Sequence, residues 1–238
     1  MNGPNRFDYT YTTNRTTAVP TPGLRTSRVE LRHILLAYGV LTLDLAIILN
    51  GDGALSLSVT GSTFSFSWEV ILVAAVAALT GFLAHELAHK YYAQRHGFWA
   101  EFRMSSFGLI FSLLTAFAGF LFAAPGATLV QGMADLRSWG RTALSGPVAN
   151  LLFAGGFLVG TFSIASQGSS TFWIGALALL TFFNAWFAAF NLIPLGPLDG
   201  RKVWRWSRPV WAGAMALSSG LALLAFGITN YGWFLPGK

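Results

Sequence analysis

Long apolar stretches separated by short polar segments dominate the chain. The mainly apolar stretches lie at about residues 34–49, 66–89, 107–124, 143–165, 171–193 and 210–228. Because a helix needs about 20 apolar residues to cross a bilayer, these stretches predict five or six membrane-spanning helices. Such helices take up roughly half of the chain and leave no room for a soluble domain of ordinary size. We therefore expect an all-α polytopic membrane protein.

The first 30 residues differ from the rest of the chain. They contain repeated threonines, three prolines and scattered arginines without apolar periodicity, which is typical of a flexible tail. The apolar stretch at 34–49 could be a signal peptide, but more than 30 residues precede it and no small-x-small cleavage pattern follows, which favours a retained helix. The predicted organisation is a flexible cytoplasmic tail at 1–30 and a single membrane-embedded domain at 31–238.

The composition agrees with a membrane protein. The 238 residues are 54% apolar and 10% charged, whereas roughly 25% of a soluble domain is charged. The net charge of +6 could indicate a nucleic-acid partner, but the basic residues lie in short groups between apolar stretches, so we expect no nucleic-acid binding. The absence of cysteine excludes disulfides and thiolate ligands, and any metal must be held by His, Asp or Glu.

The placement of the basic residues predicts the topology, because cytoplasmic loops carry an excess of Lys and Arg. Five arginines precede the first apolar stretch, which predicts a cytoplasmic N-terminus. If the stretch at 107–124 crossed the membrane fully, nine basic residues would lie inside and six outside. If it enters and returns, the division is fourteen to one, with only Lys238 outside. We therefore predict five full crossings and a re-entrant or membrane-lying segment at 107–124.

A histidine pair lies in the second apolar stretch. The sequence His85-Glu86-Leu87-Ala88-His89 places two imidazoles one helical turn apart on one face, where both can bind one metal ion with Glu86 beside them. The same pattern arises by chance in surface helices that form salt bridges. Chance is a poorer explanation inside an apolar helix, because a central charge costs about 2.5 to 3.5 kcal/mol there. The spacing favours zinc-dependent hydrolysis.

A catalytic zinc site needs a third protein ligand and an open position for water. Most other His, Asp and Glu residues lie too far along the same helix, in the tail, near the outer end of the first helix or in polar loops. Asp199 differs, because it closes an irregular run from Asn191 to Gly200 that contains two prolines and two glycines. Irregular backbone at membrane depth is tolerated only where it is buried in protein or lines a water-filled cavity. Such a run can also be a simple helix stop, but the incomplete motif makes Asp199 the predicted third ligand.

Three stretches together resemble the site-2 protease family of intramembrane zinc metalloproteases, especially its compact archaeal and bacterial members. They are the H-E-x-x-H at His85 to His89, the run Ser145-Gly146-Pro147-Val148-Ala149-Asn150, and the Asn-x-x-Pro-x-x-x-x-Asp-Gly run at 191–200. The resemblance implies one zinc ion per chain bound by His85, His89 and Asp199. It also implies that Glu86 is the catalytic carboxylate and that Asn191 lies near the scissile carbonyl.

The function implied by this resemblance is hydrolysis of peptide bonds within or near transmembrane segments of membrane-protein substrates, as in regulated intramembrane proteolysis. The expected location is the cell membrane, with the active site toward the cytoplasm. The family usually has a short hairpin after the zinc helix, for which residues 96–108 could supply strands. The chain has no room for the PDZ or nucleotide-sensing domains of some members.

Two alternatives compete with this interpretation. A membrane zinc protease for prenylated proteins also uses H-E-x-x-H but takes a downstream Glu as third ligand. Here the only such residue is Glu101, 12 residues after the motif in a basic loop, which makes that class a poor match. A metal transporter or an inactive metal-binding membrane scaffold would also use the three ligands, although Glu86 favours hydrolysis. The sequence predicts no oligomeric state.

Overall fold

Five helices of the computed structural model are long and apolar enough to cross a membrane. The structure describes residues 25–50, 67–122, 124–132, 135–167 and 171–231. The five are α1 (Arg28–Asn50), a continuous helix made of α2 (Trp68–Ala77), the π-helical η1 (Ala78–Leu83) and α3 (Ala84–Arg95), α5 (Leu136–Ser166), α6 (Thr171–Asn191) and α8 (Arg208–Tyr231). This confirms the predicted all-α membrane fold. The tail at 1–24 lies outside the described residues, and α1 begins at Arg28, just before the predicted domain boundary.

Polar side chains set the starts of several helices. The Ser67 hydroxyl accepts a hydrogen bond from the backbone N–H of Val70 at the start of α2. The Asp135 carboxylate accepts one from the N–H of Ser138 at the start of α5. Each bond satisfies one of the N–H groups that have no partner within the helix. Short polar segments therefore fix where the long apolar helices begin.

The apolar stretch at 107–124 does not form a sixth long helix. Its regular part is α4 (Ser106–Phe117), whose 12 residues span about 18 Å at the usual helical rise, too little to cross a bilayer. The strands β1 (Trp99–Met104) and β2 (Gly126–Gln131) flank α4 and pair antiparallel, with Trp99 opposite Gln131. The N–H of Ser105 donates to the backbone oxygen of Pro125 at 2.9 Å. The segment that contains α4 thus begins and ends at the same place, beside the paired strands.

The sheet corrects one expectation. Residues 96–108 supply only one strand, and its partner β2 lies beyond α4. The sequence did not predict β2, because Pro125-Gly126 marks only the end of an apolar stretch. The positive φ of Gly126, 149°, and the contact that any side chain there would make with the backbone of Arg103 explain why glycine begins this strand.

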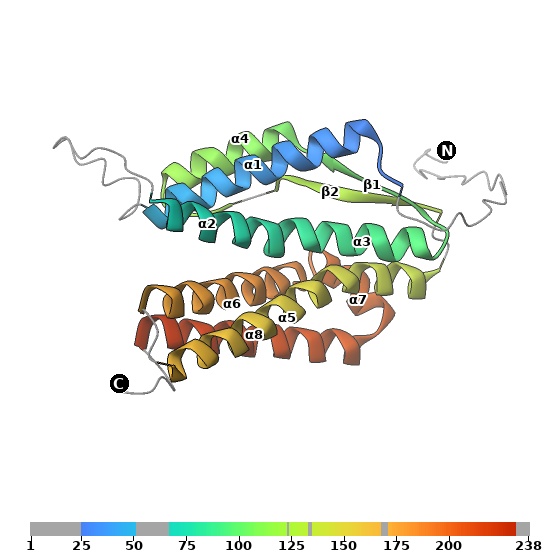
Figure 1. Ribbon diagram of the computed structural model, residues 1–238. Coiled ribbons are helices and arrows are strands. Elements are labelled where there is room, and N and C mark those ends of the chain that lie inside the picture. Colours follow the sequence, from blue (N-terminus) through green and yellow to red (C-terminus); the bar gives the residue numbers. More distant parts are fainter. Residues whose placement is uncertain (1–24, 51–66, 123, 133–134, 168–170, 232–238) are drawn as a thin grey trace, which may run out of the picture.

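The helices form two layers (Figure 1). One contains α1, α2 to α3, α4 and the sheet, and the other contains α5, α6, α8 and the short helix α7 (Asp199–Trp206). Small residues allow close packing within the second layer, where Ala154, Ala185 and Ala222 form a buried cluster. Such small-residue contacts are typical of helix packing in lipid. The layers meet along α3 and α5, which brings the histidine helix against the helix that contains Gly146.

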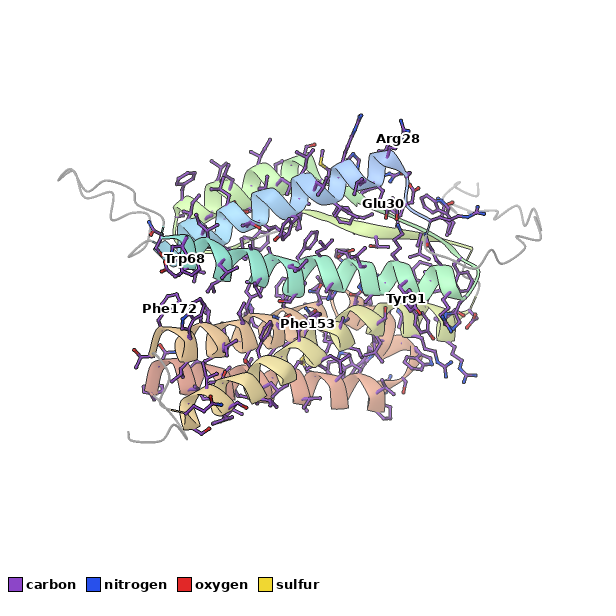
Figure 2. The ribbon with its side chains drawn as sticks, viewed as in Figure 1. Arg28, Glu30, Trp68, Tyr91, Phe153 and Phe172 are labelled. Carbon is purple, nitrogen blue, oxygen red and sulfur yellow. The ribbon has the colours of Figure 1, made fainter. Side chains whose placement is uncertain are left out.

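The two ends of the bundle differ in chemistry. Figure 2 places Arg28, Glu30 and Tyr91 toward one end and Trp68 and Phe172 at the other. The start of α1, the end of α3, the start of α5, the end of α6 and all of α7 lie at the first end (Figure 1). We call it the basic end, because the arginines at these helix termini lie there.

Candidate metal centre

His85, His89 and Asp199 come together between the two layers. The two Nε2 atoms are 3.0 Å apart. The Asp199 Oδ2 atom lies 3.2 Å from His85 Nε2 and 2.9 Å from His89 Nε2. All three residues are buried, with exposed fractions of 1%, 7% and 7%. The structure therefore places the three predicted ligands together at one buried point.

The other nitrogen of each imidazole is held by a hydrogen-bond acceptor. His89 Nδ1 donates to the backbone oxygen of Thr142 at 2.7 Å. His85 Nδ1 lies 2.6 Å from Asn150 Oδ1, and the Asn150 amide nitrogen donates to the backbone oxygen of Gly81 at 2.8 Å. Because the amide nitrogen is used in this way, the Asn150 oxygen faces His85 and must accept. Both Nδ1 atoms thus carry the proton, and both Nε2 atoms present a lone pair.

This arrangement brings three hydrogen-bond acceptor atoms together, and a cation is needed to stabilise it. Two Nε2 lone pairs and a carboxylate oxygen within about 3 Å repel one another unless a positive charge lies between them. When a tetrahedral zinc ion binds its ligands at about 2.0–2.1 Å, two ligand atoms lie about 3.4 Å apart. This separation is close to the distances among the two Nε2 atoms and Oδ2. The donor set therefore fits zinc.

A tight turn brings Asp199 to the histidines. The backbone leaves α6 after Asn191 and turns through Gly196, whose φ is 51°, before α7 starts with Asp199. A side chain at Gly200 would collide with the backbone of Leu192, so only glycine permits this close approach. The Lys202 ammonium donates to Asp199 Oδ1 at 3.1 Å. That bond leaves Oδ2 directed at the histidines.

A widened helical turn precedes the histidines. In η1 the usual helical bonding lengthens by one residue, which frees backbone oxygens for other donors. The side-chain nitrogen of Asn150 donates to two of them, Thr80 O at 3.2 Å and Gly81 O at 2.8 Å. Asn150 therefore both joins α5 to the second helix, as a buried amide is expected to do in a membrane, and orients His85. The sequence indicated only the first role.

Glu86 faces β2 instead of the three ligands. Its Oε2 atom accepts from the backbone N–H and from the hydroxyl of Thr128, both at 2.7 Å. The side chain is half-buried. These two bonds hold the Glu86 carboxylate against β2. No sequence pattern pointed to Thr128, because its role depends on the pairing of strands that lie far apart in the chain.

The remaining candidates are held elsewhere. The Asn191 amide donates to the backbone oxygen of Phe187, one turn earlier in α6, at 2.9 Å, so its role beside a scissile carbonyl stays a prediction. His96 bonds to the backbone of Tyr92, and Glu101 pairs with Arg103. Among the described residues, the one group of three or more His, Asp or Glu side chains able to hold a metal ion is that of His85, His89 and Asp199.

Comparison with known proteins places the chain in a family. A protein of Methanocaldococcus jannaschii named "Putative zinc metalloprotease" is 34% identical to this chain over 165 residues, which are 66% of this chain and 85% of the relative. The chain belongs to the family of this archaeal metalloprotease. No model of a protein family matches the chain, and no solved structure matches it. The archaeal metalloprotease's name refers to zinc, which agrees with the donor set of His85, His89 and Asp199.

Gly146 borders the ligand atoms of the candidate metal centre. A Cβ atom at this position would lie 2.5 Å from His89 Nε2 and 2.6 Å from His85 Nε2. We expect Gly146→Ala to weaken zinc binding by at least the 10- to 100-fold typical of displaced supporting groups, measured by competition with a chelator. Gly156→Ala is the matched control, since a Cβ there meets nothing within 4 Å. Equal zinc affinities of the two variants would contradict the placement of the ion beside Gly146.

Proposed function

We propose that the protein is an intramembrane zinc metalloprotease of the site-2 type, which hydrolyses peptide bonds within or near transmembrane segments of membrane-protein substrates. The observation that carries the proposal is the convergence of His85 Nε2, His89 Nε2 and Asp199 Oδ2 in a buried site, with a separate carboxylate, Glu86, on the same helix. Homology to an archaeal protein named as a zinc metalloprotease supports the reaction class. A transporter or scaffold has no need of this second carboxylate beside its three ligands.

The residues of this chain would divide the reaction as follows. Zinc, when bound by His85, His89 and Asp199, supplies a Lewis acid that lowers the pKa of water to about 7. Glu86 accepts the proton of the attacking water and later returns it to the leaving amine nitrogen. Its contacts with Thr128 fix the orientation of the carboxylate before this transfer. Asn191 would donate to the developing oxyanion after a rotation that breaks its bond to Phe187, an interaction worth about 2.7 to 4 kcal/mol per donor.

Aromatic residues support a membrane position for this site. In α8, Trp211 and Tyr231 are 20 residues apart, about 30 Å at helical rise, which matches the thickness of the hydrocarbon core. In the second helix, His85 lies seven residues before Tyr92, so it would sit roughly 10 Å below the level of that aromatic ring. Peptide bonds reaching His85 would therefore belong to a transmembrane segment or its edge.

The basic end supports a cytoplasmic orientation of the active site. Arginines at the starts of α1, α5 and α8 and at the end of α3 lie together there, as the positive-inside rule requires of a cytoplasmic face. The same orientation places the N-terminus in the cytoplasm. In this arrangement the segment from β1 through α4 to β2 would be re-entrant, a proposal supported by the hydrogen bond between Ser105 and Pro125 at its two ends.

Zinc analysis combined with a cleavage assay tests the proposal. We expect about one zinc per chain in the detergent-purified protein, loss of that zinc in Asp199→Ala, and retention in Asp135→Ala, whose carboxylate caps α5 at the surface. The wild type should cleave a reporter substrate within or near its transmembrane segment, as located by mass spectrometry. Zinc retained in Asp199→Ala would refute the ligand set, and cleavage confined to soluble peptides would refute the intramembrane role.

A further inference from the structure

Five exposed arginines gather on α5, α7 and α8 at the basic end. We name this group the arginine cluster; its members are Arg137, Arg141, Arg201, Arg205 and Arg208. Within the part of the chain that the structure describes, none of the five lies within ion-pair distance of a carboxylate. The ammonium of Lys202, which lies in α7, already forms an ion pair with Asp199. Apart from the attraction between Arg137 and the Asp135 carboxylate, the cluster is thus a concentrated positive charge that lacks carboxylate partners among the described residues.

Tryptophan side chains hold part of the cluster in place. The Arg141 guanidinium lies 5.8 Å from the centre of the Trp206 ring, and that of Arg208 lies 5.1 Å from the Trp204 ring. Trp204 in turn contacts Trp211 edge to face at 4.6 Å. A guanidinium held near a ring face by cation–π attraction has limited freedom, while its N–H groups can still donate to an anion. These contacts therefore prepare the two arginines to bind a planar or tetrahedral oxyanion.

Close packing joins the helices that carry the cluster. A side chain at Gly140 would collide with Trp206, so α5 and α7 touch at this point. Arg141 follows Gly140 directly, and Arg205 precedes Trp206. Arg201 and Arg205 are four residues apart in α7 and share one face of that helix. Arginines of α5 and of α7 therefore lie beside the contact between these two helices.

The position of the cluster identifies what would bind to it. Tryptophans gather at the level where membrane headgroups lie, and four of them, Trp139, Trp204, Trp206 and Trp211, occur in these helices. The arginine fork matches the oxygens of a phosphate group. An open surface at headgroup level meets lipid phosphates at high local concentration. We infer that the arginine cluster is a binding site for the headgroup phosphate of an anionic phospholipid.

This site lies next to the candidate metal centre. The helix α7 begins with Asp199, and its second turn carries Arg205. A headgroup held by Arg141 of α5 and Arg205 of α7 fixes α7 against α5, the helix that supplies Thr142 and Asn150 to the histidines. Bound anionic lipid thus stabilises the geometry of the metal ligands without contacting them.

Lipid titration of the full chain in detergent tests the inference without a cleavage assay. Phosphatidylglycerol and phosphatidylcholine are added separately to delipidated protein, and bound lipid is counted by native mass spectrometry. We expect tighter binding of phosphatidylglycerol. The triple variant Arg141→Gln, Arg205→Gln and Arg208→Gln should weaken it by about fivefold per arginine, roughly 100-fold in all. The result does not depend on proteolysis, so it stands or falls separately from the proposed function.

Matched variants separate this site from a general effect of positive charge. Arg28, Arg32 and Arg95 are equally exposed at the same end but lie on the other layer, so their triple exchange to Gln should leave the phosphatidylglycerol affinity within about twofold. Exchange of the three cluster arginines to Lys guards against misfolding and should preserve a preference for phosphatidylglycerol. Equal losses in both Gln variants, equal binding of the two lipids, or displacement by millimolar inorganic phosphate would each overturn the inference.

Discussion

Replacement of Glu86 by Gln is expected to abolish peptide-bond cleavage while the zinc content stays at the wild-type value. The amide has nearly the same shape, and its oxygen can still accept from the N–H of Thr128, which lies 2.7 Å from the carboxylate. It cannot accept and return a proton. Loss of a general acid and base typically lowers the rate by 10² to 10⁴, so kcat on a transmembrane reporter should fall by that factor with little change in KM.

The control for this experiment is Glu101→Gln, which changes the charge at a carboxylate paired with Arg103 in β1. That variant should cleave at the wild-type rate. Cleavage that survives in Glu86→Gln would show that Glu86 takes no part in hydrolysis. A transporter is expected to tolerate the Glu86 change. Transport would therefore be supported if proteoliposomes containing Glu86→Gln took up metal and the wild type showed no protease activity.

Replacement of Glu30 by Ala is expected to lower the free energy of unfolding by about 3–5 kcal/mol, the usual cost of leaving a buried charge unpaired. Glu30 is fully buried in α1 and lies 2.6 Å from the ammonium of Lys90, itself 1% exposed. The other Glu30 oxygen accepts from the N–H of Phe102 in β1 at 2.9 Å. One carboxylate thus joins α1, the histidine helix and the sheet. Denaturant unfolding in mixed micelles, followed by tryptophan fluorescence, measures the change.

The pair of Glu101 and Arg103 supplies the comparison. Its side chains are 15% and 33% exposed, so Glu101→Ala should cost no more than about 1 kcal/mol. A double variant, Glu30→Leu with Lys90→Met, removes both buried charges and should recover much of the lost stability. A similar small loss in both alanine variants would mean that the buried pair contributes nothing particular to holding α1.

Local patterns were sufficient for much of this protein. Apolar length predicts the long helices, and the spacing of His85 and His89 on a helix follows from the helical period alone. Asp199 could be predicted as a ligand because the chain has few acidic residues and the Pro- and Gly-rich run before Asp199 cannot continue a regular helix. Gly146 and Asn150 were visible as a motif, but their contacts were not, since a motif does not reveal which atoms a neighbouring helix will meet.

Features that depend on pairing over distance could not be predicted. The strand β2 has six residues and becomes recognisable only when β1 lies beside it. Thr128 reaches Glu86 because that sheet packs on α3. The ion pair of Glu30 and Lys90 joins residues 60 positions apart, and nothing in either local sequence identifies its partner.

The widened turn η1 makes the metal centre depend on a residue count. Each residue of an α-helix advances the side-chain direction by about 100°, and a π turn accommodates one residue more than an α turn of the same length. The helical phase of α3 is therefore offset from that of α2 by about a quarter of a turn. If an ordinary α-helix with one residue fewer replaced residues 78–83, the chain would keep both His85 and His89. Their side chains would nevertheless point away from Asp199.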